Sequence, residues 1–495
     1  MKLIRETDLK SMCLNTIVKH IDLYVKPNEA IETFLEYLKR CFSDRLFNLL
    51  ERKTLFPETY LEFLLTPHWK NVSMSSCIDY SFTRLMSKFQ IMGQGITSLN
   101  LENSTYSVDM LSAVICCVPN ITSLNLRWTY CNDVLLALIK KMCISLASLN
   151  ISNCKNVSDA GMVNLCNTNN EDSGFNSLKT LNIIQTAVTR QGVITLLKHL
   201  RSLHWLYYKD LSKILYNLHK SDFENNPIRY NLKCFEYNRE RVALRKMLEV
   251  WAVMCPFVTR ISIQDKITNV DLELCTRFQN LKKFKITSTN YHPRGIIISP
   301  FISVKGAMLT ELKVMHATVS VETIVKLCPN LKQLFLFNVT FEVFSLTDLN
   351  NGNYVLDNMA SLTVKHFDFG RDLLAFDSIY LLIKSSKYLN ELCIQYIEGF
   401  TDILADIILE LPYLSVVDFS FTDIKNSTLF RFLIREHITQ MSVDGCPDVS
   451  LDDNSINKLI SENQSGNTCS WVIDYSEMAC ESMWDYSMWS GEIYM

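Results

Sequence analysis

ITSLNL at residues 96–101, ITSLNL at 121–126 and LASLNI at 146–151 align without gaps at a step of 25 residues. Each copy has the form Leu-x-x-Leu-x-Leu with small variations. The stretches between the copies, such as VDMLSAVICCV from Val108, carry apolar residues at three- and four-residue spacing, which is typical of amphipathic helices. The sequence therefore predicts a structural repeat in which a short strand alternates with a helix.

The template recurs along the chain with lower fidelity. Further copies begin at Leu178, Val258, Leu281, Leu309, Leu331, Leu389, Leu414 and Ile438, and weaker ones are expected around Leu206, Leu232 and Phe367. Because strand side chains alternate, the two central apolar residues of each copy point into the stack, and a single unit leaves its top and bottom bare. We therefore predict an α/β leucine-rich-repeat solenoid, a horseshoe with parallel strands on its concave wall and helices on its convex wall. A doubly wound sheet also alternates strands and helices, but the fixed step argues against it.

The rhythm is interrupted twice by polar, glycine-bearing inserts, NTNNEDSGFN at 167–176 and TDLNNGNYVLDN at 347–358, which read as surface loops. Between about Lys209 and Pro256 we expect an irregular pair of helices with weak repeat signal. The predicted organisation is a helical N-terminal region over 1–90, a solenoid over 91–450, and a cap or tail over 451–495.

Composition narrows the classes of partner and compartment. Lysine and arginine total 49 against 52 acidic residues, which gives a net charge of -3. The chain therefore lacks the excess of positive charge that binds a polyanion, and we expect no nucleic-acid partner. The 17 cysteines include no Cys-x-x-Cys pair and read as small buried side chains. No signal peptide is seen at the start, and no apolar run reaches the ~18 residues of a membrane span. We expect a cytoplasmic and/or nuclear protein that does not enter membranes.

No catalytic motif is found. GQGITS from Gly93 has two glycines of a phosphate loop but lacks the Gly-Lys-Ser/Thr ending, so it predicts a turn before a strand. The nine histidines include no His-Glu-x-x-His, and His199 and His204 read as packing or surface residues. We therefore expect a protein that is no enzyme and takes no cofactor.

The third clear copy extends to LASLNISNCKNVSDAGM, in which Cys154 turns the chain out of the strand and Ser158 or Asp159 caps the next helix. It closely resembles the cysteine-containing subtype of leucine-rich repeat, and VDGCPDVS around Cys446 does so too. That subtype is common in substrate receptors of ubiquitin ligases.

The stretch TDLKSMCLNTIVKHIDLY from Thr7 predicts an amphipathic helix, with Leu9, Cys13 and Ile17 on one stripe. These residues resemble the elongin-binding box of VHL-type and SOCS-type substrate receptors, although Asp8 stands where that box has Ser or Thr. The resemblance implies that Leu9 enters an apolar pocket of elongin C, the partner of elongin B, while the small Cys13 lets the helix lie close.

LFPETYLEFLL from Leu55 resembles the downstream cullin-contacting box, with Phe56, Pro57 and Tyr60 in the matching positions. A competing alignment from Phe42 lacks the proline. The two boxes and the cysteine-type repeats together resemble the Zyg-type receptors of cullin-2 RING ligases. The armadillo repeats of those receptors have no counterpart in this sequence, so their recognition of N-terminal glycine is not carried over.

Partner binding is expected at strand positions that face away from the core. Aromatic and arginine side chains are the usual anchors of protein interfaces. The candidates are Arg127, Trp128, Trp205, Tyr207, Phe335 and Phe337. The alternative is that these aromatics cover neighbouring repeats and that Asn100, Asn125, Asn150 and Asn182, which form one column, stabilise the strand edges.

These patterns favour the substrate-recognition subunit of a cullin-RING ubiquitin ligase, which holds a protein substrate on its repeat face. One alternative is a stand-alone interaction scaffold of ribonuclease-inhibitor-like architecture, in which residues 1–90 only cap the solenoid. Another is an F-box-type receptor, since FPETYLEFLL followed by Trp69 has a faint F-box character.

Overall fold

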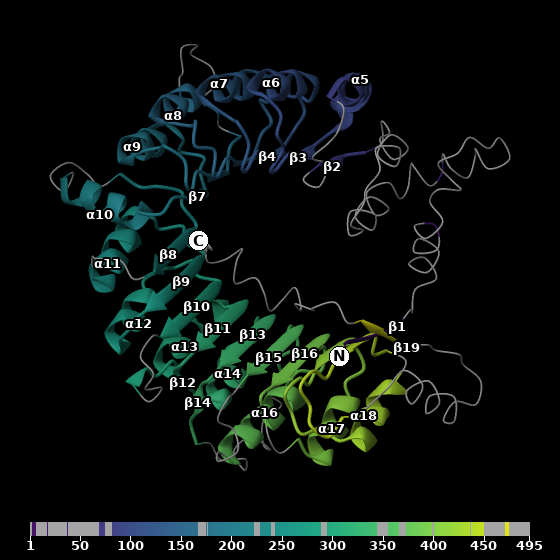
Figure 1. Cartoon of the computed structure of the whole chain (residues 1–495). Coiled ribbons are helices and arrows are strands. Elements are labelled where there is room, and N and C mark those ends of the chain that lie inside the picture. Colours follow the sequence, from purple (N-terminus) through teal and green to yellow (C-terminus); the bar gives the residue numbers. More distant parts are fainter. Residues whose placement is uncertain are drawn as a thin grey trace. The chain divides into compact units, whose positions relative to one another are not determined.

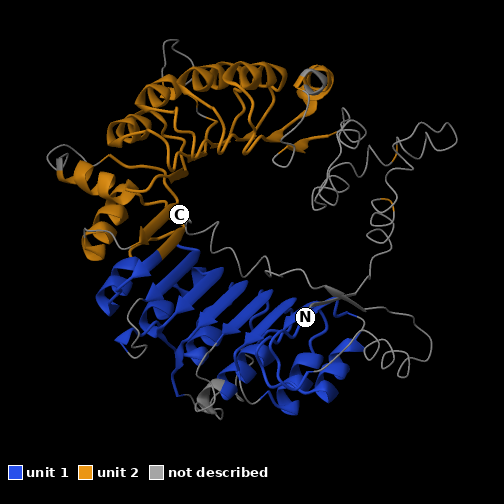
Figure 2. Cartoon of the chain, viewed as in Figure 1, with its two compact units in different colours: residues 1–9, 263–276, 281–495 blue, residues 10–262, 277–280 orange. Residues whose placement is uncertain are grey.

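The protein was analysed as a computed structural model. It describes residues 2–5, 17, 37, 69–74, 82–166, 175, 177–221, 228–238, 243–288, 295–343, 355–365, 373–397, 400–435, 437–449 and 471–474. The chain divides into two compact units: unit 1 holds residues 1–9, 263–276 and 281–495, and unit 2 holds residues 10–262 and 277–280 (Figure 2).

Unit 2 contains a six-stranded parallel sheet with helices along one side of it (Figure 1). The strands follow chain order: β2 (Asn71–Ser73), β3 (Ser98–Asn100), β4 (Ser123–Asn125), β5 (Ser148–Asn150), β6 (Thr180–Asn182) and β7 (Trp205–Tyr207). The helices are α5 (Phe82–Met92), the short 3-10 helix η2 (Gly93–Gly95), α6 (Val108–Cys117), α7 (Asp133–Met142), α8 (Asp159–Cys166) and α9 (Arg190–His199). The template leucines are paired in register, Leu99 with Leu124 and Leu124 with Leu149, and all three are buried.

Unit 2 continues through α10 (Leu211–Ser221), β8 (Cys234–Asn238), α11 (Leu244–Met254) and the start of β9 (Arg260–Asp265). The two helices predicted after Lys209 are confirmed, and β8 between them is the weak copy expected around Leu232. Leu232, Phe235 and Tyr237 are all buried, so phenylalanine and tyrosine take the places of the template leucines. This segment is therefore built from the same unit as the rest.

Unit 1 contains parallel strands in the order β10, β11, β13, β15, β16, β17, β18. Their bounds are β10 (Lys283–Ser288), β11 (Glu311–Met315), β13 (Gln333–Phe337), β15 (Ser361–Lys365), β16 (Glu391–Gln395), β17 (Val416–Asp418) and β18 (Gln440–Ser442). The helices are α12 (Asn269–Cys275), α13 (Ser299–Lys305) with the 3-10 turn η4 (Gly306–Met308), α14 (Val321–Leu327), α16 (Leu373–Ser385), α17 (Asp402–Leu409) and α18 (Asn426–Leu433). A separate parallel pair is formed by β12 (Thr318–Val319) and β14 (Thr340–Phe341).

One weak copy is displaced from its predicted place. Phe367 lies outside the described residues, and the strand of this region is β15, six residues earlier. Its core-facing residues are Leu362 and Val364, preceded by Met359 in place of the first leucine, and Thr363 between them is buried as well. Because methionine fills the same core space as leucine, this repeat packs like the others although its sequence departs from the template.

The edge of the unit 1 sheet is extended by two strands, of which β1 (Lys2–Arg5) runs antiparallel to the sheet and β19 (Trp471–Asp474) runs antiparallel to β1. β1 pairs with β18, Lys2 opposite Ser442, and β19 pairs with β1. Terminal repeats of a solenoid need such a cover, because an open edge exposes unpaired backbone groups. The region predicted as a helical N-terminal segment thus supplies β1 to unit 1 and β2 to unit 2.

Nine of the described strands, β3 to β6, β11, β13 and β16 to β18, are followed by a turn of one conformation. Two residues beyond the second buried strand residue, the backbone takes a positive φ. The residues are Asn103, Trp128, Asn153 and Gln185 in unit 2, and His316, Asn338, Tyr396, Phe421 and Gly445 in unit 1. Asparagine and glycine adopt this region readily, whereas aromatic residues rarely do. At Gly445 a Cβ would also lie 2.5 Å from the ring of Phe421, which stacks on Tyr396 at 4.5 Å.

Hydrogen bonds join the helix starts of consecutive repeats in unit 2. The Ser158 hydroxyl accepts from the backbone N–H of Ala160 at 3.2 Å, so Ser158 caps α8. Asp159 instead accepts from the next repeat, from the Thr189 N–H at 2.7 Å and its hydroxyl at 2.5 Å. One repeat earlier, Asp133 accepts from the Ser158 N–H at 2.8 Å and hydroxyl at 2.6 Å. Each aspartate therefore clamps the following helix start, where sequence alone left Ser158 and Asp159 equivalent.

The predicted alternation of parallel strands and helices is confirmed in both units. The stretch from Gly93 forms the turn expected before the first clear copy, as the 3-10 helix η2 followed by β3. Within the described part of the chain, the helices are all too short or too polar to pass through a lipid bilayer.

Candidate partner-binding surfaces

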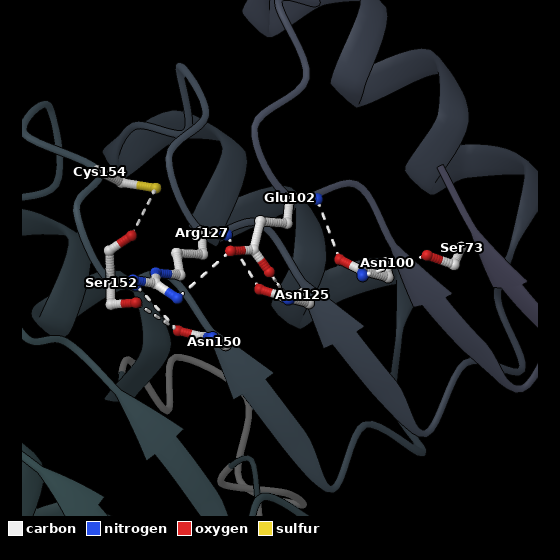
Figure 3. A network of polar contacts seen from close by, with 8 residues as sticks. All are labelled: Ser73, Asn100, Glu102, Asn125, Arg127, Asn150, Ser152 and Cys154. Atoms are coloured by element: carbon white, nitrogen blue, oxygen red, sulfur yellow. Dashed lines mark hydrogen bonds and ion pairs between the residues drawn. The ribbon is translucent and has the colours of Figure 1, made fainter. Parts of the chain in front are cut away.

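The asparagine column lies on the outward face of unit 2, in register from strand to strand (Figure 3). In each case the side-chain oxygen accepts from the backbone N–H two residues further on. The distances are 3.0 Å from Glu102 to Asn100, 3.0 Å from Arg127 to Asn125, 3.1 Å from Ser152 to Asn150 and 3.1 Å from Ile184 to Asn182. These asparagines therefore fix the exit of the chain from each strand, which is the structural role that the sequence left open for them.

Arg127 is joined to the same network. Asn125 donates to Glu102 at 2.9 Å, and the Arg127 guanidinium lies 3.3 Å from the other oxygen of that carboxylate (Figure 3). The Arg127 side chain is 45% exposed. An ion pair this open to water contributes about 0 to 1 kcal/mol, so a partner can take over the guanidinium at little cost.

Trp128 follows Arg127 in the left-handed turn and not on the strand itself. The backbone N–H of Trp128 donates to the Ser152 carbonyl at 3.1 Å, and the residue is 50% exposed. Half of this large side chain is left uncovered by the neighbouring repeats, so Trp128 keeps the exposure that an interface anchor needs.

Cys154 and Cys446 share one geometry, in the two repeats that resemble the cysteine-containing subtype. The Cys154 thiol donates to the Leu126 carbonyl at 3.0 Å, and the Cys446 thiol donates to the Phe419 carbonyl at 3.1 Å. Both sulfurs also lie 3.7 Å from a threonine hydroxyl of the preceding repeat. These cysteines are thus hydrogen-bond donors that join adjacent repeats.

Replacing Cys154 by alanine is expected to lower the free energy of unfolding by about 1 kcal/mol, because the Leu126 carbonyl loses one donor and keeps the Thr129 hydroxyl, which donates to it at 2.7 Å. Cys154→Ser should cost less than Cys154→Ala, since a hydroxyl can donate in place of the thiol. Cys143 is the matched control: it is buried, and its thiol has no hydrogen-bond partner among the described residues. At Cys143, serine should therefore lower the stability more than alanine does, because its hydroxyl would be buried without a partner. Urea unfolding of the four variants measures these differences. If serine and alanine rank in the same order at Cys154 and Cys143, the proposed hydrogen bond of Cys154 is contradicted.

Trp205 and Tyr207 lie together on the outward face of unit 2, and their role in binding stays a prediction. The Arg260 guanidinium stacks over the Trp205 ring, 4.8 Å from its centroid. Burial raises the pKa of Tyr207, and the neighbouring Cys234 and Glu236 add to the rise. The Cys234 thiol donates to the Glu236 carboxylate at 3.5 Å. The result is a half-buried cluster of aromatic and charged groups.

Phe335 and Phe337 both point outward from β13 in unit 1. Strand register sets Phe335 beside Lys313 of β11 and Thr363 of β15. Phe337 meets the His316 ring edge to face, with centroids 5.5 Å apart. The six predicted residues thus fall in separate places, with Arg127, Trp128, Trp205 and Tyr207 in unit 2 and the two phenylalanines in unit 1.

Glu311 lies buried between two lysines on the same face of unit 1. Its carboxylate is 2.8 Å from Lys283 and 3.3 Å from Lys313, with 6% of the side chain exposed. Burial alone would raise the pKa of Glu311, but the hydrogen bonds and charges of both lysines outweigh it and lower that pKa below its usual value.

Glu311→Gln is expected to lower the free energy of unfolding at neutral pH by about 1 to 3 kcal/mol, the range for hydrogen bonds to charged groups. The folded pKa lies below the unfolded value of about 4.3, so this stabilisation is complete above that pH and is lost as the pH falls through the folded pKa. Urea midpoints of wild type and variant should therefore converge below about pH 4. Glu391→Gln, in the same register column with no ion pair among the described residues, is the control and should show no convergence.

The residues of the two predicted boxes are mostly beyond what the structure describes. Leu9, Cys13, Phe56, Pro57 and Tyr60 lie outside the described residues, and their roles stay predictions. Ile17 is helical and only 7% exposed. An adaptor could contact Ile17 only after its side chain is uncovered.

Several charged residues of these surfaces were missed by sequence reasoning. Glu236, Arg260, Lys283, Lys285 and Lys313 all occupy outward strand positions. The signal was present, since positions three and five of each template copy face outward, but only aromatic and arginine residues of some copies were selected. In the described part of the chain, no cluster of three or more His, Cys, Asp or Glu residues could hold a metal ion.

Comparison with known proteins gives weak likenesses in structure. No protein-family model matches the sequence, and no curated protein matches it. A chain in the crystal structure of the yeast Rad7 and Elc1 complex is 17% identical, with a TM-score of 0.42 over 83% of this chain and 93% of that chain. A leucine-rich-repeat protein of Leptospira interrogans is 12% identical, with a TM-score of 0.31 over 83% and 86%. An internalin of Listeria monocytogenes is 15% identical, with a TM-score of 0.28 over 81% and 85%.

The class of protein follows from the repeat geometry. Strands paired in parallel and in register, helices along one side, and buried leucines at a fixed step define an α/β leucine-rich-repeat solenoid. This fold presents strand faces whose outward side chains are free of core packing, as in scaffolds for protein interactions.

Proposed function

We propose that this chain is a non-catalytic receptor that holds another protein on its outward strand faces. The observation that carries the proposal is the cluster of Trp205, Tyr207, Glu236 and Arg260, which projects from strands away from the core. Tryptophan, tyrosine and arginine are the residues most often found as interface anchors.

We further propose that the chain is the substrate-recognition subunit of a cullin-RING ubiquitin ligase in the cytoplasm or nucleus. Leu9, Cys13 and Ile17 would bind elongin C, which is joined to elongin B, and Phe56, Pro57 and Tyr60 would contact cullin-2. The support is the resemblance of both boxes together with the cysteine-type repeats, whose thiol geometry recurs at Cys154 and Cys446.

Elongin binding is tested with the full chain in a pull-down with purified elongin B and elongin C. The double variant Leu9→Ala, Cys13→Ala should reduce recovery at least about tenfold, because truncating the anchor of a helix-in-groove contact removes most of its affinity. Lys10→Ala, on the polar side of the predicted helix, is the control and should recover elongin normally. Undiminished recovery by the double variant, or no recovery by wild type, would remove the elongin proposal.

The second candidate is a stand-alone scaffold, favoured by the burial of Ile17 within this chain. In that case Leu9→Ala should lower the free energy of unfolding by roughly 2 to 5 kcal/mol, as for a buried leucine, and wild type should not bind elongin. Urea unfolding of the same variants separates the two candidates.

A further inference from the structure

The outward face of unit 1 carries an excess of positive charge over β10, β11, β13 and β15. Strand register places these outward side chains in columns. Four lysines and one glutamate stand among them, which sum to a charge of +3: Lys283, Lys285, Lys313 and Lys365 against Glu311. Lys283 and Lys313 are paired with Glu311, and Lys285 is 9% exposed. We call this surface the lysine face.

Aromatic side chains lie inside the lysine face. Phe335 and Phe337 project from β13, between Lys313 of β11 and Lys365 of β15, and His316 packs against Phe337. A positive surface with central aromatic rings favours a chain segment that is acidic and aromatic, because both the charge and the apolar contacts are then matched.

One segment of this chain has that chemistry. Residues 475–495 read YSEMACESMWDYSMWSGEIYM. They contain no lysine, arginine or histidine. Their acidic residues are Glu477, Glu481, Asp485 and Glu492, and their aromatic residues are Tyr475, Trp484, Tyr486, Trp489 and Tyr494.

The segment starts at the edge of the same sheet. β19 ends at Asp474 and pairs with β1, which in turn pairs with β18. From β19 to β10 the sheet order takes eight steps, which at about 4.8 Å each is roughly 38 Å. Twenty-one extended residues reach up to about 70 Å, so the segment is long enough to cross the lysine face. Tethering at this edge also keeps its local concentration high, on the order of millimolar.

We propose that residues 475–495 bind in cis to the lysine face of unit 1. Their carboxylates lie beside the lysines of β10, β11 and β15, and their tryptophans lie against Phe335 and Phe337. The segment thereby competes with an outside protein for this surface. That last consequence rests on the proposed receptor function, whereas the cis contact does not.

The cis contact is tested in the full chain by placing the photo-crosslinking amino acid p-benzoylphenylalanine at Phe335. Irradiation of dilute protein should link this position to a peptide from 475–495 within one chain. The control is the same amino acid at Tyr388, an aromatic residue of unit 1 that is 51% exposed and lies outside the strands. It should give little or no link to 475–495.

Charge reversal shows whether the lysines direct the contact. Glu477→Lys, Glu481→Lys and Asp485→Lys together should lower the link yield at Phe335 about tenfold, because like charges then meet. Adding Lys365→Glu, at a partly exposed position of β15, should restore part of it, while leaving the lysines that hold Glu311 in place. Raising the salt concentration should lower the wild-type yield without any substitution, which keeps the test decisive if a variant fails to fold.

Three results would overturn the proposal: equal yields from Phe335 and Tyr388, a yield that neither charge reversal nor salt changes, or links found only between two chains. The proposed function is judged separately. A cis link without any captured partner would contradict the receptor role alone, and a bound partner without the cis link would contradict the present inference alone.

Discussion

Phe419→Ala is expected to lower the free energy of unfolding of unit 1 by about 4 kcal/mol, the largest effect that we predict for one substitution. The Phe419 ring is fully buried and lies between two others, 4.9 Å from Phe400 and 5.1 Å from Phe432. Its carbonyl also accepts the Cys446 thiol. Removing the ring leaves a cavity between the strand and helix layers of consecutive repeats, which a solenoid cannot close without shifting its neighbours.

The matched control is Phe421→Ala, two residues further along. Phe421 is 42% exposed and packs on one aromatic ring, Tyr396. We expect its loss to cost about 1 kcal/mol or less. Urea unfolding followed by near-ultraviolet circular dichroism measures both variants. Equal losses of unfolding free energy at Phe419 and Phe421 would show that the burial of the aromatic ring does not determine its contribution to the stability of unit 1.

Gly161→Ala is expected to destabilise unit 2 by about 3 kcal/mol. A Cβ at residue 161 would lie 2.3 Å from the Asp133 carboxylate oxygen and 2.8 Å from the side chain of Leu136. The same carboxylate oxygen accepts the Ser158 N–H. The methyl group must therefore displace the Asp133 carboxylate that joins α7 to α8, and the partly buried start of α8 loses its hydrogen-bond partner.

Two comparisons make the Gly161 prediction specific. Gly295→Ala adds the same methyl group in open space and should leave stability nearly unchanged. In the background Asp133→Ala, the carboxylate that clashes is gone, so Gly161→Ala should cost at least about 1 kcal/mol less than in wild type. Additive losses in the double variant would contradict the clamp. Gly192, whose Cβ would lie 2.3 Å from Asp159, offers the same test one repeat later.

The repeat could be predicted from the sequence because its signal is local. A strand of three residues with one buried leucine, as in β3 to β5, needs only a period of two, and the helices need only their apolar stripes. β15 was misplaced because Met359 and Thr363 blur the template. The clamp by Asp159 could not be chosen over capping, since its partner Thr189 lies thirty residues away.

The candidate surfaces were predicted only in part. Trp205, Tyr207, Phe335 and Phe337 were found because aromatic residues at outward positions are conspicuous in the sequence. Arg260 over Trp205 is a contact between separate strands, and it follows only once the register is known. The pairing of β1 with β18 joins residues about 440 positions apart, for which no local pattern exists.

That pairing also has a consequence for the order in which the protein is made. Residues 2–5 leave the ribosome long before their partners in β18, which follow only after roughly 20 to 90 s of synthesis at about 5 to 20 residues per second. During that interval the earliest stretch of the nascent chain must wait unpaired, or be sheltered by a chaperone. A bulky fusion before Lys2 would therefore lie beside β18. It would hinder the pairing of β1 with β18 more than the folding of the repeats that precede β18.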